Sequence, residues 1–214
     1  MKCYSRGEEI ANSVTHGIGA LFGIVALTMM VIFAALYGNA WQVVSVAIYG
    51  GTLVLLFTMS TLYHAFTNEK VKKVFKIFDH ASIYLLIAGT YTPYTLVILR
   101  EGSSIGWTLF GIVWGIAVLG IVFGTVFIGK FRLLKVLTYL IMGWAIVFAM
   151  PELISRMNLL GAIKGIYWLA AGGLSYSVGA IFYIIKVKYF HSIWHLFVLL
   201  GSVCHFISIM FYVI

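Results

Sequence analysis

Seven apolar stretches, each about twenty residues long, recur along this chain and limit what it can fold into. A helix of that length crosses the hydrocarbon core of a bilayer. The composition agrees, because 63% of the 214 residues are hydrophobic and 9% are charged, against about 25% charged in an average soluble domain. We therefore predict an all-α integral membrane protein, a single seven-helix bundle over residues 1–214. The predicted helices cover residues 13–37, 41–64, 75–99, 105–128, 133–150, 165–185 and 190–213.

The segments between these helices are short and leave no room for a soluble domain. We expect residues 1–12 to form a polar start and residues 67–76 to form the most charged loop. A further loop is predicted over residues 152–164, after a proline that ends the fifth helix. Pro93 removes a backbone hydrogen bond inside the third helix and should kink it.

Lysine and arginine are distributed unevenly between the two sides of the predicted bundle. Cytoplasmic segments of membrane proteins collect these residues, and the bias fixes the orientation. One side holds Arg100, Arg156 and Lys164, whereas the side of the N-terminus holds the other eleven: Lys2, Arg6, Lys70, Lys72, Lys73, Lys76, Lys130, Arg132, Lys135, Lys186 and Lys188. We therefore predict a cytoplasmic N-terminus and an extracytoplasmic C-terminus. The same bias accounts for the net charge of +8, so we expect contacts with anionic membrane lipids and no nucleic-acid partner.

Polar side chains from three predicted helices fall at one depth, near the cytoplasmic side. His191 and His195 are four residues apart at the start of the last helix, which places both imidazoles on one face. Ser60 and His64 end the second helix, and Asp79 lies near the start of the third. Ionisable side chains are costly inside a membrane, so this convergence indicates a functional site.

Three histidines and one aspartate at one depth suit a catalytic zinc ion. Three neutral imidazoles plus a water form a typical catalytic zinc shell, and the metal lowers the pKa of that water towards about 7. We predict His64, His191 and His195 as zinc ligands and Asp79 as the base that holds the water. Ser60, one turn before His64, is predicted to support the ligands or to polarise a substrate carbonyl.

Other interpretations remain open for each of these residues. The three histidines could lie in the headgroup region without a metal, and Asp79 could pair with Lys76. For His16 and His80 the sequence favours such an ordinary structural role. A last histidine, ten residues beyond His195, lies about 15 Å further along the helix, too deep to join the site.

Five motifs carry a resemblance to a known family: EIANSVTHG (residues 9–17), STLYH (60–64), FDHASIY (78–84), GTYTPY (89–94) and HSIWH (191–195). In this order they resemble the bacterial hemolysin III proteins, which belong with the progestin and adipoQ receptors. The resemblance covers essentially the whole chain. It implies seven helices in a bacterial plasma membrane and an inner-leaflet zinc site, with its three histidines at His64, His191 and His195, its aspartate at Asp79 and its serine at Ser60.

Three functions follow as hypotheses. The first is a zinc-dependent hydrolase that cleaves an amide or ester bond in a membrane lipid, because the wider superfamily includes such enzymes. The second is a pore-forming cytolysin, as the family name implies, although a channel should show polar stripes along several helices. The third is a sensor or regulator of membrane lipids in which zinc has a structural role.

Overall fold

The computed structural model describes residues 4–101, 104–127 and 130–214. All the regular elements over these residues are helices, and seven helical spans are long and apolar enough to cross a membrane, which confirms the predicted fold class. Lys2 and the predicted end of the fourth helix at residue 128 lie outside the described residues. The elements are α1 (Arg6–Tyr37), α2 (Ala40–Ala65), α3 (Glu69–Pro93), the π-helix η1 (Tyr94–Ile98), α4 (Ile105–Val126), α5 (Arg132–Trp144), the 3-10 helix η2 (Ala145–Ala149), α6 (Met150–Leu159), α7 (Lys164–Ile184) and α8 (Phe190–Tyr212).

Two segments predicted to be non-helical near the charged end are helical. The polar start belongs to α1, because Ser5 caps the helix and exchanges hydrogen bonds with Glu8 in a capping box. The charged loop predicted over residues 67–76 is mostly the first two turns of α3. Asn68 starts this helix by accepting hydrogen bonds from the backbone N–H groups of Lys70 and Val71.

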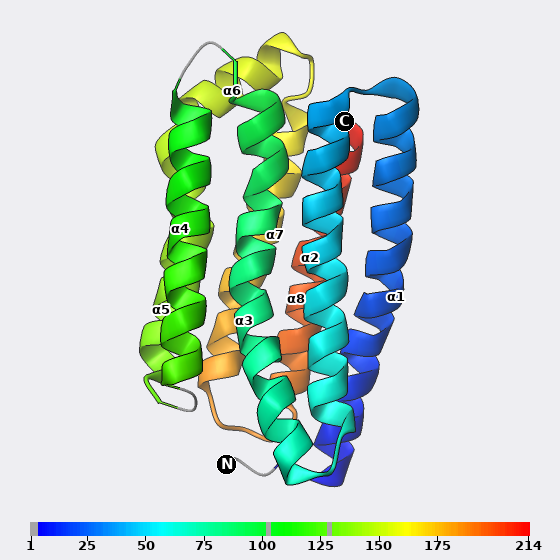
Figure 1. The fold of residues 1–214 in the computed structure, drawn as a ribbon, viewed down its shortest axis with the longest axis vertical. Helices are drawn as coiled ribbons and strands as arrows, with labels where there is room; N and C mark the ends of the chain where they lie inside the picture. The colour runs from blue at the N-terminus through cyan, green and yellow to red at the C-terminus, as the bar shows by residue number, and fades with distance from the viewer. Residues whose placement is uncertain (1–3, 102–103, 128–129) are drawn as a thin grey trace.

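The predicted loop over residues 152–164 was also wrong for most of its length. Proline is tolerated in the first turn of a helix, so Pro151 lies in the first turn of α6, which begins at Met150, instead of ending the preceding helix. Leu153 and Met157, one turn apart, are both fully buried, and Glu152 pairs with Arg156 at 2.8 Å. The helix α6 lies across one end of the bundle (Figure 1).

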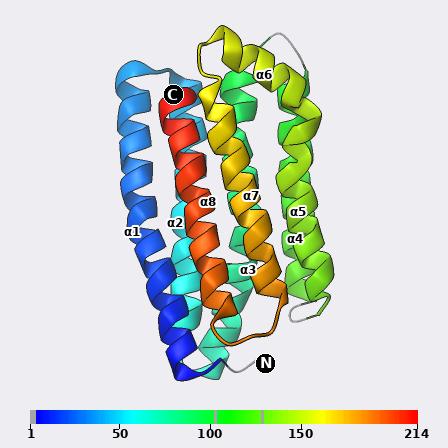
Figure 2. The same ribbon diagram turned by 180° about the vertical axis from the view of Figure 1, so that it is seen from behind.

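The seven spans form a bundle in which α1 packs against both α2 and α8, so the first and last helices are neighbours (Figures 1 and 2). The span that α3 forms with η1 is the most buried of the seven. In its most apolar segment 72% of the residues are buried inside the bundle, against 22% for α4. The start of α1 and the C-terminus lie at opposite ends (Figure 1). The links α2–α3, α4–α5 and α7–α8 all lie at the end where α1 starts, so the structure gathers the cation-rich segments there.

Pro93 marks a local change of helix type within the third span. It has no N–H to donate to the carbonyl of Gly89, and the chain continues beyond it as the π-helix η1. The wider turn is closed by the backbone N–H of Leu99, which donates to the carbonyl of Tyr94 at 2.9 Å.

Candidate metal centre

Three histidines from two helices meet at the cation-rich end of the bundle. His64 lies in the last turn of α2, and His191 and His195 lie in the first two turns of α8. One ring nitrogen from each lies within 4.8 Å of the other two. The Nε2 atoms of His191 and His195 are 3.2 Å apart. His64 and His195 are 3% and 2% exposed, so this group of nitrogens is shielded from water.

Residues of α1 contact the Nδ1 atoms of two of the three rings. One carboxylate oxygen of Glu9 lies 2.6 Å from Nδ1 of His64, and the other accepts a hydrogen bond from Lys72 at 2.6 Å. The backbone carbonyl of Asn12 lies 3.1 Å from Nδ1 of His195. Because an ionised carboxylate and a carbonyl can only accept, both Nδ1 atoms carry the proton and both Nε2 atoms present a lone pair. Proteins orient metal-binding imidazoles in this way.

Nε2 of His64 is the atom that a metal would satisfy. It is buried and has no hydrogen-bond partner among the described residues. A buried polar atom without a partner is costly. Nε2 of His195 can accept a hydrogen bond from Nε2–H of His191, whereas Nε2 of His64 has no donor beside it among the described residues. A cation among the three nitrogens would satisfy all of them, so the residues present fit a divalent metal. Three neutral imidazoles suit zinc, and they also suit copper, iron or nickel.

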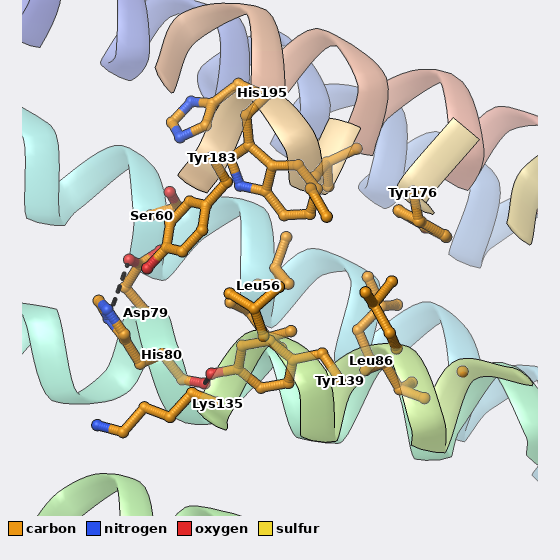
Figure 3. A pocket seen from close by; sticks show the side chains of 18 of the residues that line it. Leu56, Ser60, Asp79, His80, Leu86, Lys135, Tyr139, Tyr176, Tyr183 and His195 are labelled. Carbon is orange, nitrogen blue, oxygen red and sulfur yellow. Dashed lines mark hydrogen bonds and ion pairs between the residues drawn. The ribbon is translucent and has the colours of Figure 1, made fainter. Parts of the chain in front are cut away.

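Ser60 and Asp79, the other two predicted site residues, line the cavity beside the histidines (Figure 3). Ser60 is 1% exposed, and its Oγ has no hydrogen-bond partner within the described part of the chain. The carboxylate of Asp79 contacts Nδ1 of His80 at 3.5 Å, and the same nitrogen lies 2.8 Å from the carbonyl of Lys76. Neither Ser60 nor Asp79 belongs to the three-histidine group, so their roles stay predictions.

His16 lies closer to this centre than its position in the sequence suggested. Its ring stacks on that of His195, with centroids 3.5 Å apart and planes 11° apart. Sequence reasoning missed the support from Glu9 and Asn12, and also from Thr15, whose hydroxyl lies 3.2 Å from Nδ1 of His195. The available signal was the spacing of Glu9, Asn12 and His16 by three and four residues, which places them on one face of α1.

A cavity of about 890 Å³ lies beside the histidines, within the range of about 300–1,000 Å³ found for small-molecule sites. Asp79, His80 and Lys135 lie at one end in the close-up view, and Leu86 and Tyr176 lie at the other (Figure 3). Most of its lining side chains are apolar or aromatic, and they come mainly from α3, α5, α7 and α8. The arrangement therefore places polar and ionisable groups at one end of an apolar chamber.

Seven membrane-spanning helices with a histidine trio at one end define a polytopic membrane protein with a candidate metal centre. A family model described as "Haemolysin-III related" matches residues 4–206, and the chain belongs to this family. It is 48% identical over 206 residues to the "Hemolysin-3 homolog" of Bacillus subtilis (strain 168), covering 96% of this chain and 94% of that protein.

Two further relatives extend the comparison. The chain is 48% identical to "Hemolysin-3" of Bacillus cereus, covering 97% of this chain and 92% of that protein. It is 29% identical to the human "Monocyte to macrophage differentiation factor", covering 97% of this chain and 84% of that protein. The family, the seven apolar helices and the Bacillus relatives identify a multi-pass protein of the bacterial plasma membrane.

Proposed function

We propose that this protein is a zinc-dependent hydrolase that cleaves an amide or ester bond of a membrane lipid. The observation that carries the proposal is the buried, unpartnered Nε2 of His64 facing His191 and His195 beside an apolar cavity. Three protein ligands with a fourth position left open are typical of catalytic zinc. When bound, such an ion supplies an acidified water and polarises a carbonyl.

The chain's own residues supply positioning and proton transfer. Glu9 and Asn12 fix the ring orientations of His64 and His195 through their Nδ1 atoms. We assign Asp79 to accept a proton from the attacking water, and the hydroxyl of Ser60 to donate to the carbonyl oxygen of the scissile bond. The apolar cavity would hold the acyl chain and keep bulk water away from the reacting bond.

A pore is a weaker candidate, even though the relatives are named hemolysins. Away from the histidines, Thr95, Ser202 and Ser208 are buried polar residues within the bundle. These groups are bonded within the protein: Thr95 donates to the carbonyl of Tyr91, and Ser208 donates to that of Gly165. Polar groups that satisfy one another stabilise the bundle and need no aqueous path.

The test is a cleavage assay on purified, zinc-loaded protein with a panel of ceramide-like and acyl lipids, read by mass spectrometry of the products. We expect Asp79→Asn to lower the rate by about 10²–10⁴-fold without changing the zinc content. Glu69→Gln, which removes a carboxylate from the first turn of the same helix, is the matched control and should keep full activity. Stoichiometric zinc without cleavage of any lipid in the panel would leave the metal a structural role and overturn the hydrolase.

We further propose that the end carrying the metal centre faces the cytoplasm, since it gathers most of the cations. Alkaline phosphatase fused to the C-terminus should then be active, because that enzyme folds only outside the cytoplasm. A silent alkaline phosphatase together with an active cytoplasmic reporter at the same position would reverse the orientation.

A further inference from the structure

Cations gather around the cavity at the end that carries the metal centre. Six of them line it: Lys73, Lys76, Lys130, Arg132, Lys135 and Lys186. They come from the start of α3, the α4–α5 link with the start of α5, and the α7–α8 link, so the fold brings together three separate segments. Asp79 is the one carboxylate lining the cavity in the described part of the chain. Lys73, Lys130 and Lys186 are exposed, so the cavity meets solvent on this side.

None of these six cations forms an ion pair with a carboxylate among the described residues. Lys72, at the same end, is already paired with Glu9 and does not line the cavity. Lys135 donates to two backbone carbonyls at the end of α4, and Arg132 lies 4.4 Å from the ring centre of Tyr183. Those contacts leave the positive charges uncompensated, so this end of the cavity favours an anion.

The apolar interior of the cavity adds a second requirement for the ligand, a hydrocarbon chain. Away from the cations its lining includes Leu86, Ile146, Leu169 and Val198, which suit a hydrocarbon chain rather than a free ion. A neutral lipid would fill the apolar part and leave the cations unused. A ligand that satisfies both parts carries a hydrocarbon chain and an anionic head. Phosphate, with several strong acceptor oxygens, suits several cations at once.

We propose that the cavity binds a lipid with an anionic phosphate headgroup, with its chain in the apolar part and its phosphate among Lys73, Lys130 and Lys186. As a statement about the substrate of the hydrolase it rests on the proposed function, but binding itself needs no cleavage. The metal centre lies beside this head end, so a bond close to the headgroup would be the one presented to it.

The experiment measures binding to the full-length protein in a neutral detergent by native mass spectrometry. The probes are palmitoyl glycerol phosphate, the uncharged palmitoyl glycerol with the same chain, and inorganic phosphate. We expect the phosphorylated lipid to bind at least about tenfold more tightly than the uncharged one. Its advantage should shrink as salt is added, because the exposed cations are screened.

The double variant Lys130→Gln with Lys186→Gln should lose most of this preference. The matched control, Lys70→Gln with Lys188→Gln, removes two cations from the same end that do not line the cavity and should keep it. Equal binding of the charged and uncharged lipids would overturn the proposal, and so would an equal loss in the control. Competition by inorganic phosphate at the same concentration as the lipid would also overturn it, since the site would then be one for free phosphate.

Repeating the measurement after the metal has been removed with a chelator separates this inference from the hydrolase. A charge preference that survives chelation, together with no cleavage of the phosphorylated lipid by the zinc-loaded protein, would count against the hydrolase alone. Cleavage that is indifferent to the headgroup, together with equal binding of both lipids, would count against the phosphate site alone.

Discussion

The helix α8 carries two buried histidines that look alike locally and differ in their surroundings. His195 and His205 are 2% and 6% exposed, and each has one ring nitrogen bonded to a backbone carbonyl, of Asn12 at 3.1 Å and of Leu169 at 3.2 Å. The other nitrogen of His195 belongs to a group with two more imidazoles. His205 has no such group around it in the part of the chain that the structure describes.

The difference shows that burial and a single hydrogen bond do not identify a ligand. His205 packs closely against α7, where a Cβ added at Gly172 would overlap its ring. Around His195 the neighbouring helices supply two more imidazoles instead: His16 of α1 stacks on its ring, and His64 of α2 lies edge-on to it with ring centroids 5.2 Å apart. The candidate metal site lies where several helices bring donors to one point, whereas the isolated His205 packs against its neighbours.

The sharpest test of this contrast is the metal content of two variants. We expect His191→Ala to reduce bound zinc from about one ion per chain to almost none, because two imidazoles do not complete a catalytic zinc shell. His205→Gln, which keeps a polar side chain of similar reach, should retain the full content. Elemental analysis of purified protein by mass spectrometry measures both. Equal zinc contents in the two variants would contradict the conclusion that the histidines around His195 differ from His205 in metal binding.

A smaller effect is expected from the carboxylate behind His64. Glu9→Gln keeps the shape of the side chain but removes its charge and its pairing with Lys72. Loss of such outer partners typically weakens metal affinity by about 10–100-fold, and competition with a coloured chelator measures this change. Glu69→Gln is the control, because Glu69 lies in the first turn of α3 and forms no ion pair with a histidine among the described residues. An unchanged affinity in Glu9→Gln would mean that α1 does not tune the site.

Because His205 packs against α7, we expect that disturbing this contact lowers stability and leaves the bound metal unchanged. Gly172→Ala places a methyl group against His205 and should lower the free energy of unfolding by about 1–3 kcal/mol, with the zinc content preserved. Gly115→Ala on α4 has nothing within 4 Å of the added carbon and should be neutral or stabilising by about 0.5–1 kcal/mol. Thermal unfolding in detergent compares the two, and equal midpoints would contradict the close packing around His205.

The sequence was enough for the seven spans, because the energy of burying apolar residues in lipid dominates and is readable from hydropathy. It was less informative at helix ends. There, single contacts decide, such as the hydrogen bonds of Ser5 that begin α1 and the buried pair Leu153 and Met157 that keeps α6 helical.

At the candidate site, too, some features could be predicted from the sequence and others could not. The depth of each residue in the membrane could be predicted from its position along its helix. This correctly placed His64, His191 and His195 at the same depth. The direction in which each helix faces could not be derived, because it depends on how all the helices pack together. For that reason Glu9 and Asn12, on a segment interpreted as a polar start, were missed as the partners that hold the rings.

The smallest expected effect concerns the hydrogen bond of Tyr94, which lies near His205. The loss of stability in Tyr94→Phe can be compared with that in Tyr91→Phe, one turn earlier on the same span. Tyr94 donates to Ser208 at 2.7 Å, and Ser208 in turn donates to a carbonyl of α7. Tyr94→Phe leaves that second bond intact, so we expect a loss of about 0.6 kcal/mol, the average for such bonds in membranes. Tyr91 also accepts from the backbone N–H of Ile146 at 2.8 Å, so Tyr91→Phe leaves a buried donor unpaired and should cost about 1–3 kcal/mol. Chemical unfolding of both variants in mixed micelles measures the difference, and a larger loss for Tyr94→Phe would contradict the expected order, because the Tyr94–Ser208 bond would then be worth more than the pairing of the Ile146 N–H.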